Sequence, residues 1–205
     1  MAEEIIMNST GDYYFWHPYK SRSMNVIETK LKGCLILEPT IFEDDRGYFY
    51  ESFNKTKFQK LTGATGNFVQ DNQSKSSYGV VRGLHQQIGE FAQAKLVRVL
   101  DGKVLDVAVD VRKGSPTFGE HIAIELSAEN NRQMYIPRGF LHGFAVLSDS
   151  VTFFYKCDNM YNKDAENGVN PLDSTLNIDW QIEGDEMILS EKDKQAPSFK
   201  DLFEK

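Results

Sequence analysis

Short stretches in which apolar and polar residues alternate dominate the chain from Met24 onward, and a period of two is typical of β-strands. The clearest example is KVLDVAVDV (103–111), which places Leu105, Val107, Val109 and Val111 on one face. The other face carries Asp106, Ala108 and Asp110. This alternation predicts antiparallel sheet with one face in the core.

Turn and cap signals divide the strand-like stretches. Asp101-Gly102 separates KLVRVL from KVLDVAVDV and predicts a two-residue hairpin between them. Helical signals are few: TKFQKLTG (56–63) predicts two turns ending at Gly63, and SEKDKQAP (190–197) predicts a short helix capped by Ser190. Many short strands without an internal repeat predict an all-β protein, a cupin-like jelly roll or a small β-barrel.

The chain of 205 residues fits one domain with a buried core. Residues 1–23 show no regular spacing of apolar residues, and Met24 resembles the first residue of a natural chain. We therefore expect a leader or appendage over 1–23 and a single domain over 24–205.

Charge and cysteine usage narrow the function classes. The net charge of -7 argues against general binding to nucleic acid or to an anionic membrane surface. Cys34 and Cys157 each lie in an apolar run, which predicts two buried thiols rather than a bridge. The sequence has no apolar run near 18 residues, and Glu3 and Glu4 stand where a signal peptide carries basic residues. These features predict a cytoplasmic protein.

A β-barrel of this size holds a small ligand inside, so inward-pointing polar residues are the candidates for chemistry. Arg82, His85 and Lys95 are the most informative, because two cations beside a histidine are stable only with an anion between them. Strict alternation places Arg82 and His85 on opposite faces unless the strand is bulged, and Gly83 is where a bulge fits. The full set of candidates is Arg46, Glu51, Gln70, Asn72, Arg82, His85, Lys95, His142 and Tyr155.

Each of these residues also has a purely structural interpretation. His85 fits an imidazole packed beside Leu84, Tyr155 in FFYKC fits an aromatic core, and Asp193 in SEKD fits a capping box. On the residues alone, these interpretations are favoured. The four histidines contain no His-x-His pair, so their spacing gives little support to a three-histidine metal site.

Longer motifs carry a resemblance to a known family. The stretches are FEDDRGYFYESF, FVQDNQSKS, VVRGLHQQ, AKLVRVLDGKVLDVAVDVRKGSPTFGE, LSAENNRQMYIPRGFLHGF, FFYKCDNMY and NIDW, in that order. Together they resemble the dTDP-4-dehydrorhamnose 3,5-epimerase family of nucleotide-sugar epimerases over about residues 30–197. So many long motifs in sequence make the resemblance highly specific.

The resemblance implies a cupin (jelly-roll) enzyme without metal or cofactor that works as a homodimer. Its substrate would be a dTDP-linked 4-keto-6-deoxy sugar, inverted at C3 and C5 beside the C4 ketone. By motif, His85 matches the catalytic base and Tyr155 the acid. Asp193 matches the carboxylate that pairs with the histidine, and Lys95 the cation nearest the ketone oxygen.

Other positions match substrate-binding residues of the family. Tyr161 matches a residue that stacks on the thymine, and residues from about 40 to 72 are expected near the partner's site in the dimer. The remaining matches are Arg46, Glu51, Gln70, Asp71, Asn72, Arg82, His142, Glu166 and Lys192.

Some positions depart from the family pattern and leave alternatives open. Gln86 replaces a common aromatic residue, Met160 replaces a frequent second tyrosine, and NPLDS replaces a stretch that usually contains tryptophan. A 3-only or 5-only epimerase is therefore the nearest alternative. A keto-sugar isomerase, a metal-dependent oxygenase and a sugar-binding cupin without catalysis are the others. The joint presence of His85, Tyr155 and Asp193 argues against the last.

Overall fold

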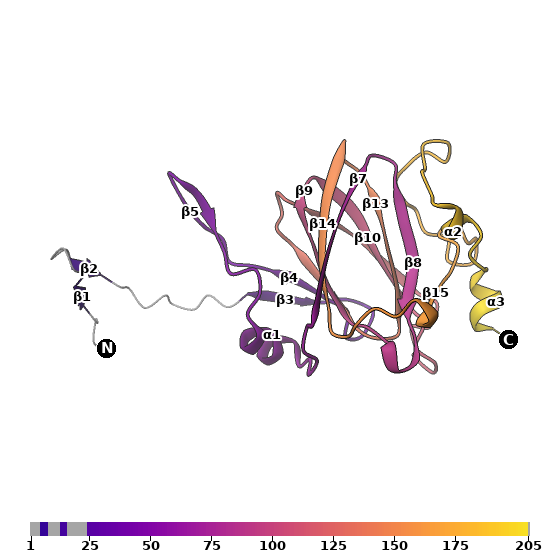
Figure 1. The fold of residues 1–205 in the computed structure, drawn as a ribbon, viewed down its shortest axis with the longest axis horizontal. Helices are drawn as coiled ribbons and strands as arrows, with labels where there is room; N and C mark the ends of the chain where they lie inside the picture. The colour runs from indigo at the N-terminus through magenta and orange to yellow at the C-terminus, as the bar shows by residue number, and fades with distance from the viewer. Residues whose placement is uncertain (1–4, 8–12, 16–23, 205) are drawn as a thin grey trace.

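Two antiparallel β-sheets lie face to face in a computed structural model that describes residues 5–7, 13–15 and 24–204 (Figure 1). The five-stranded sheet has the order β11 (His121–Ser127), β10 (Lys103–Asp110), β13 (Phe140–Val146), β8 (Val81–Gln87), β15 (Glu166–Gly168). The six-stranded sheet has the order β3 (Asn25–Glu28), β4 (Leu35–Glu38), β12 (Gln133–Ile136), β9 (Lys95–Asp101), β14 (Ser150–Cys157), β7 (Gln70–Ser77). The expected all-β jelly-roll architecture of the cupin type is confirmed.

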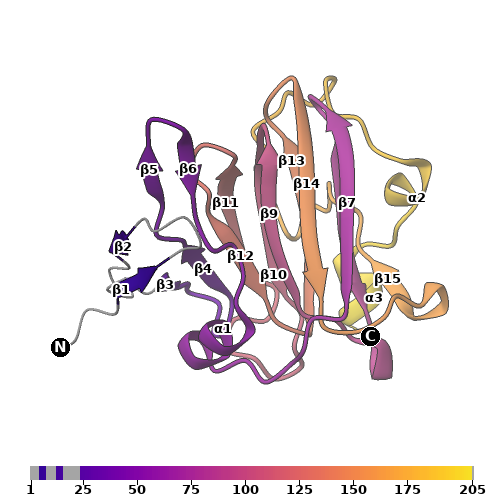
Figure 2. The same ribbon diagram turned by 60° about the vertical axis from the view of Figure 1, so that its left-hand side comes forward.

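Two smaller strand pairs stand outside these sheets. β5 (Phe42–Asp44) and β6 (Gly47–Phe49) form a hairpin that projects from the body at the end opposite β8 and β15 (Figures 1 and 2). β1 (Ile5–Met7) pairs with β2 (Tyr13–Phe15). The expected boundary of the leader at residue 23 lies outside the described residues.

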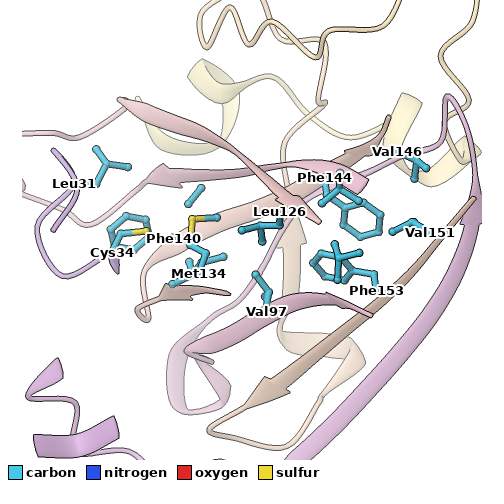
Figure 3. Close-up of a cluster of buried hydrophobic side chains, with 14 residues drawn as sticks. Leu31, Cys34, Val97, Leu126, Met134, Phe140, Phe144, Val146, Val151 and Phe153 are labelled. Carbon is cyan, nitrogen blue, oxygen red and sulfur yellow. The ribbon is translucent and has the colours of Figure 1, made fainter. Parts of the chain in front are cut away.

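The main core fills the space between the two sheets. Phe144 of β13 stacks on Phe153 of β14 with ring centroids 4.3 Å apart, so the sheets are in direct contact through their inner faces. Figure 3 shows this cluster of apolar side chains, which extends to Leu31 and Cys34 at its other end. Both Cys34 and Cys157 are buried free thiols, as predicted from their apolar surroundings.

The prediction that β10 buries only one face is wrong. The Leu and Val face packs against a C-terminal segment that contains Leu176, Trp180 and Phe199, while the face with Asp106 and Ala108 points between the sheets. Every residue from Val104 to Asp110 is therefore buried. Because β10 is covered on both faces, its acidic residues lie inside the protein rather than in water.

The predicted hairpin at Asp101-Gly102 is also wrong. β9 pairs with β12 and β14, whereas β10 pairs with β11 and β13, so the chain crosses from one sheet to the other at this point. Gly102 has φ +80°, and a Cβ there would collide with the Ser150 carbonyl oxygen. The Asp-Gly signal thus marks a tight corner between sheets, where only glycine fits.

Short helices close the molecule. α1 (Lys55–Thr62) begins where the Asn54 side chain accepts a hydrogen bond from the Lys57 N–H, and it ends at Gly63 with φ 70°. The Ser190 side chain caps α2 (Glu191–Lys194), so both predicted helices are confirmed. The remaining helical elements are α3 (Phe199–Phe203), η1 (Gly89–Phe91) and η2 (Lys163–Ala165).

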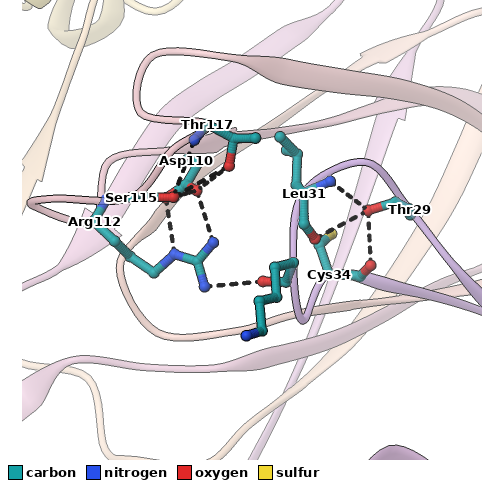
Figure 4. Close-up of polar contacts among 8 residues, drawn as sticks. Thr29, Leu31, Cys34, Asp110, Arg112, Ser115 and Thr117 are labelled. Carbon is teal, nitrogen blue, oxygen red and sulfur yellow. Dashed lines mark hydrogen bonds and ion pairs between the residues drawn. The ribbon is translucent and has the colours of Figure 1, made fainter.

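A second buried acid on β10 anchors the loop before β4. The Asp110 carboxylate accepts hydrogen bonds from the side chains of Arg112, Ser115 and Thr117, and Arg112 Nη1 donates to the Lys32 carbonyl oxygen at 2.9 Å (Figure 4). Burial opposes ionisation of Asp110, but these donors outweigh it and hold its pKa far below the usual range.

Candidate active site

His85 and Asp193 form the centre of the candidate site. His85 lies on β8, and its Nε2 lies 2.6 Å from Oδ1 of Asp193 in α2. The Ser190 cap places Asp193 in the first turn of α2, where its own N–H donates to the Ser190 hydroxyl. Its carboxylate points to His85 instead of closing a reciprocal capping box. Burial opposes ionisation of Asp193, but the hydrogen bond and charge of His85, together with Ser190 and Lys192, outweigh it and lower the pKa of Asp193.

A register shift in β8 brings Arg82 and His85 to the same face. His142 of β13 pairs with His85, and Phe144 pairs with Arg82, so three residue steps on β8 face two on β13. Glycines permit the close approach of the strands here: a Cβ on Gly83 would lie 2.6 Å from the Gly143 Cα. The bulge expected at Gly83 is confirmed, and both side chains point between the sheets.

Tyr155 and Lys95 reach the same region from the facing sheet. Tyr155 is on β14 and Lys95 on β9, with the Lys95 Nζ 5.9 Å from the centroid of the Tyr155 ring. Burial raises the pKa of Tyr155, and the Arg82 charge only partly opposes this effect. Burial lowers the pKa of Lys95, and nearby negative groups oppose this effect only in part. A phenol with a raised pKa stays neutral at pH 7 and can donate its proton.

Glu166 connects the two sides of the site. Its Oε1 lies 3.9 Å from the His85 Nδ1, and its Oε2 accepts from the Lys192 ammonium at 2.8 Å and from the Tyr161 hydroxyl at 2.9 Å. Burial opposes its ionisation, but these two donors outweigh it and lower the pKa of Glu166. Glu166 also acts electrostatically on Lys95 and Tyr155. We call His85, Asp193, Glu166, Lys95 and Tyr155 the His85 cluster.

Polar side chains of β7 line the inner face beside this cluster. Asn72 pairs in register with Tyr155, and its Nδ2 donates to the Cys157 sulfur at 3.7 Å. Gln70 donates to Asn72 and accepts from the Tyr161 N–H. Gln70 and Asn72 therefore lie next to the candidate acid on the inner face of the sheet.

His142 and Arg82 complete the surroundings. The His142 Nε2 lies 2.7 Å from Oδ1 of Asp106, directly beside His85 in the sheet. The Arg82 Nε donates to the Ser76 hydroxyl of β7 at 3.1 Å, which links the edges of the two sheets. Sequence reasoning missed Asp106 as a partner of this site. The sequence did contain a signal, since Asp106 is an acidic residue within a largely apolar strand. We expected its face of the strand to meet solvent.

Three predicted binding residues lie away from the His85 cluster in the single chain. Arg46 is exposed in the β5–β6 turn and pairs with Asp44. Glu51 pairs with Lys57 at 2.9 Å. The Asp71 side chain lies on the outer face of the six-stranded sheet, paired with Lys156 at 2.9 Å. A surface hollow on that face is lined by residues that include Tyr48, Tyr50 and Arg98.

Two further structural findings concern metals and membranes. In residues 24–204, no group of three or more His, Cys, Asp or Glu side chains is arranged to hold a metal ion. Within the described chain, no helix has the length and apolar character that crossing a membrane requires.

The fold and the cluster define a jelly-roll protein with a histidine–carboxylate pair on one sheet and a tyrosine–lysine pair on the other. The family model described as dTDP-4-dehydrorhamnose 3,5-epimerase matches residues 28–201. The chain therefore belongs to the dTDP-4-dehydrorhamnose 3,5-epimerase family, whose members are isomerases. This confirms the resemblance found in the sequence.

Solved structures agree with this family. The dTDP-4-dehydrorhamnose 3,5-epimerase from Elizabethkingia anophelis NUHP1 is 60% identical, with a TM-score of 0.86 over 89% of this chain and 100% of that chain. A Legionella pneumophila 3,5-epimerase, solved in complex with dTDP-4-keto-L-rhamnose, is 50% identical, with a TM-score of 0.82 over 85% of this chain and 92% of that chain. A 3'-monoepimerase from Streptomyces bikiniensis, in complex with dTDP-quinovose, is 36% identical, with a TM-score of 0.77 over 83% of this chain and 85% of that chain.

Proposed function

We propose that the protein epimerises a dTDP-4-keto-6-deoxyhexose at C3 and C5, converting dTDP-4-dehydro-6-deoxyglucose to dTDP-4-dehydrorhamnose. One observation carries the proposal: His85 comes from one sheet, and Tyr155 comes from the facing sheet. Inversion requires a proton to leave one face of the sugar and another to arrive on the opposite face. A ring held between the sheets would meet a base on one side and an acid on the other.

The proton-accepting atom in this proposal is Nδ1 of His85. Its Nε2 lies 2.6 Å from the Asp193 carboxylate, and an ionised carboxylate only accepts hydrogen bonds, so Nε2 carries the hydrogen. Nδ1 then has a free lone pair. Asp193 would orient the ring and stabilise the imidazolium that forms, as in other histidine–carboxylate pairs. The His85 side chain is 29% exposed, so a substrate can reach it.

Lys95 would stabilise the enolate. Removing a hydrogen next to a ketone places negative charge on the ketone oxygen, and a fixed cation at that oxygen lowers the barrier. Lys95 lies beside Tyr155, so the oxyanion site and the proton donor are on the same sheet. The neutral Tyr155 hydroxyl would then protonate the carbon from the face opposite His85.

The remaining predicted residues would hold the nucleotide and sugar. The Tyr161 ring is 53% exposed and tied to Glu166 by its hydroxyl, which suits a platform for the thymine. Arg82 and Lys192 supply cationic donors for a diphosphate. Gln70, Asn72 and His142 supply neutral polar groups on the inner faces. The Asp71 side chain points away from these groups, so Asp71 would act through its backbone.

The homodimer belongs to the same proposal. Arg46 and Glu51 lie in the segment around the β5–β6 hairpin, far from the cluster of their own chain, and the hairpin exposes 60% of Tyr48 and 64% of Phe49. Exposed aromatic residues of this kind suit an interface with a second copy. Arg46 and Glu51 would then serve the partner's site. The two buried free thiols support a reducing cytoplasm as the place where the protein works.

The direct test uses purified protein, dialysed against a chelator, with dTDP-4-dehydro-6-deoxyglucose. NMR of the product should show inversion at both C3 and C5. Inversion at C3 alone would make the protein a 3-epimerase like its Streptomyces bikiniensis relative. An oxidised product formed with uptake of O2, lost on chelation and restored by a metal ion, would support the oxygenase alternative.

A further inference from the structure

A buried carboxylate beside the His85 cluster has no role in the proposed chemistry so far. Asp106 has no exposed surface, and its side chain points between the sheets from β10. Its Oδ1 lies 2.7 Å from the His142 Nε2, while its buried Oδ2 has no hydrogen-bond partner in the protein. An ionised carboxylate in such a place is stable only when nearby positive charge compensates for lost hydration.

Asp106 fixes the position of the His142 ring. His142 contacts Asp106 at one edge, and its ring lies 25° from parallel to the Phe153 ring with centroids 6.1 Å apart. Phe153 belongs to the facing sheet, so His142 is held between the two sheets. His142 also pairs in register with His85. A substitution of Asp106 that removes this contact would therefore change the orientation of the His142 ring, which lies next to the proposed base His85.

Asp106 also acts on Lys95. In the described part of the chain, the Lys95 ammonium forms no ion pair within 4.0 Å with any carboxylate, yet Asp106 and Glu166 both favour its charged form. Burial works in the opposite direction. The titratable groups that face Lys95 are Asp106 on β10, His142 on β13, Tyr155 and Cys157 on β14, and Glu166 on β15.

Among these groups, Asp106 is the carboxylate whose negative charge near Lys95 is neither paired with a lysine nor involved in substrate binding. Glu166 is already bound to Lys192 and Tyr161, and the thiol of Cys157 is neutral because burial raises its pKa to about 11. Asp106 cannot touch a substrate, since its side chain is completely enclosed.

We propose that Asp106 is a positioning residue of the epimerase, which orients His142 and keeps the Lys95 ammonium charged where the enolate oxygen forms. This rests on the proposed epimerisation. Lys95 stabilises the enolate only as a cation. Burial raises the pKa of Asp106 and the His142 and Lys95 charges oppose this effect, so the Asp106 carboxylate and the Lys95 ammonium each favour the charged form of the other. The low internal dielectric makes such an interaction stronger than it would be in water.

The Asp106→Asn variant separates charge from shape. The amide oxygen of asparagine can still accept from His142, so the ring stays in place while the negative charge is lost. We expect kcat to fall about 10- to 100-fold with KM changed by less than about threefold, as for other supporting residues. The alkaline limb of the kcat profile should move to lower pH, because the Lys95 ammonium then loses its proton more easily.

Asp110→Asn is the matched control. Asp110 lies on the same face of β10 and is equally buried, but its partners are Arg112, Ser115 and Thr117. It should lose stability without moving the alkaline limb. A shift of the limb in Asp106→Asn that is absent in Asp110→Asn assigns the effect to Lys95, whose charged form Asp106 favours.

The outcomes separate this inference from the function on which it rests. Wild-type protein that does not exchange substrate hydrogens refutes the proposed function. Active wild-type protein together with an Asp106→Asn variant of unchanged kcat and pH profile refutes the role of Asp106. If Asp106→Asn does not fold, the Lys95→Met/Asp106→Asn double variant decides. Removal of the Lys95 ammonium should restore folding, because no uncompensated buried cation remains, and a double variant that also fails to fold would overturn the proposal.

Discussion

The His85 Nε2 and the Asp193 Oδ1 lie 2.6 Å apart although 108 residues separate them in the sequence. The contact joins a strand of the sandwich to a short helix that packs outside it, so the C-terminal segment is part of the site. Asp193 is 3% exposed, and its carboxylate has His85 as its side-chain partner. Replacement of this one carboxylate should therefore change catalysis without dismantling the sheets.

The Asp193→Asn variant should lower kcat about 100-fold or more. The amide keeps the size of the side chain but no longer fixes the tautomer or stabilises the imidazolium. Steady-state kinetics measures the loss. Asp201→Asn is the matched control, because Asp201 follows the Ser198 cap in α3 as Asp193 follows Ser190 in α2. Equal losses in both variants would mean that helix capping explains the effect.

Tyr155→Phe should separate proton removal from inversion. The ring remains in place and only the donor hydroxyl is lost, so hydrogen exchange with solvent should survive better than formation of inverted product. We expect product formation to fall about 100-fold. His85→Ala should abolish both reactions. Exchange at the wild-type rate in His85→Ala would show that another group is the base.

Gly102→Ala tests the corner between the sheets. The φ of +80° costs about 1–2 kcal/mol for a residue with a Cβ, and collision with the Ser150 carbonyl adds to this, so we expect a loss of about 3 kcal/mol or more. Urea denaturation measures the free energy of unfolding. Gly114→Ala is the control, since Gly114 also has φ +80° but a Cβ there meets no atom within 4 Å. Equal losses would show that the close approach at Gly102 is unimportant.

The proposed dimer predicts that each site contains residues from both chains. Light scattering at micromolar concentration should give twice the mass of the chain. Arg46→Ala should weaken binding of dTDP about tenfold or more in the dimer, because Arg46 would contact the nucleotide held by the partner. Lys75→Ala, which changes an exposed side chain of β7, should leave binding unchanged. A monomer with full activity would refute this arrangement.

Local signals in the sequence predicted local structure well. The end of α1 at Gly63 and the start of α2 at Ser190 depend on groups a few residues apart, so their chemistry is visible in the sequence. The bulge at Gly83 was also predictable from nearby residues, because Arg82 and His85 can share a face only if the strand is bulged between them. The proposed roles of His85, Tyr155 and Asp193 came from the family resemblance, since each residue also had a structural interpretation.

Long-range pairing was not predictable in the same way. Asp101-Gly102 has the composition of a hairpin turn, but whether its flanking strands pair with each other depends on β12, β14, β11 and β13. The burial of Asp106 likewise depends on distant parts of the chain: the facing sheet covers its face of β10, while a C-terminal segment covers the Leu and Val face. Strand alternation gives the two faces of a strand but does not tell which of them meets water.

The most direct test of the account is the fate of substrate hydrogens in deuterated water. The protein is incubated with dTDP-4-dehydro-6-deoxyglucose for a long period and in excess, and NMR locates the deuterium. If His85 and Tyr155 act on both carbons beside the ketone, the product carries deuterium at C3 and at C5, with C3 exchanging faster. Deuterium at C3 alone would contradict double epimerisation, and no deuterium at either carbon would contradict the proposed chemistry itself.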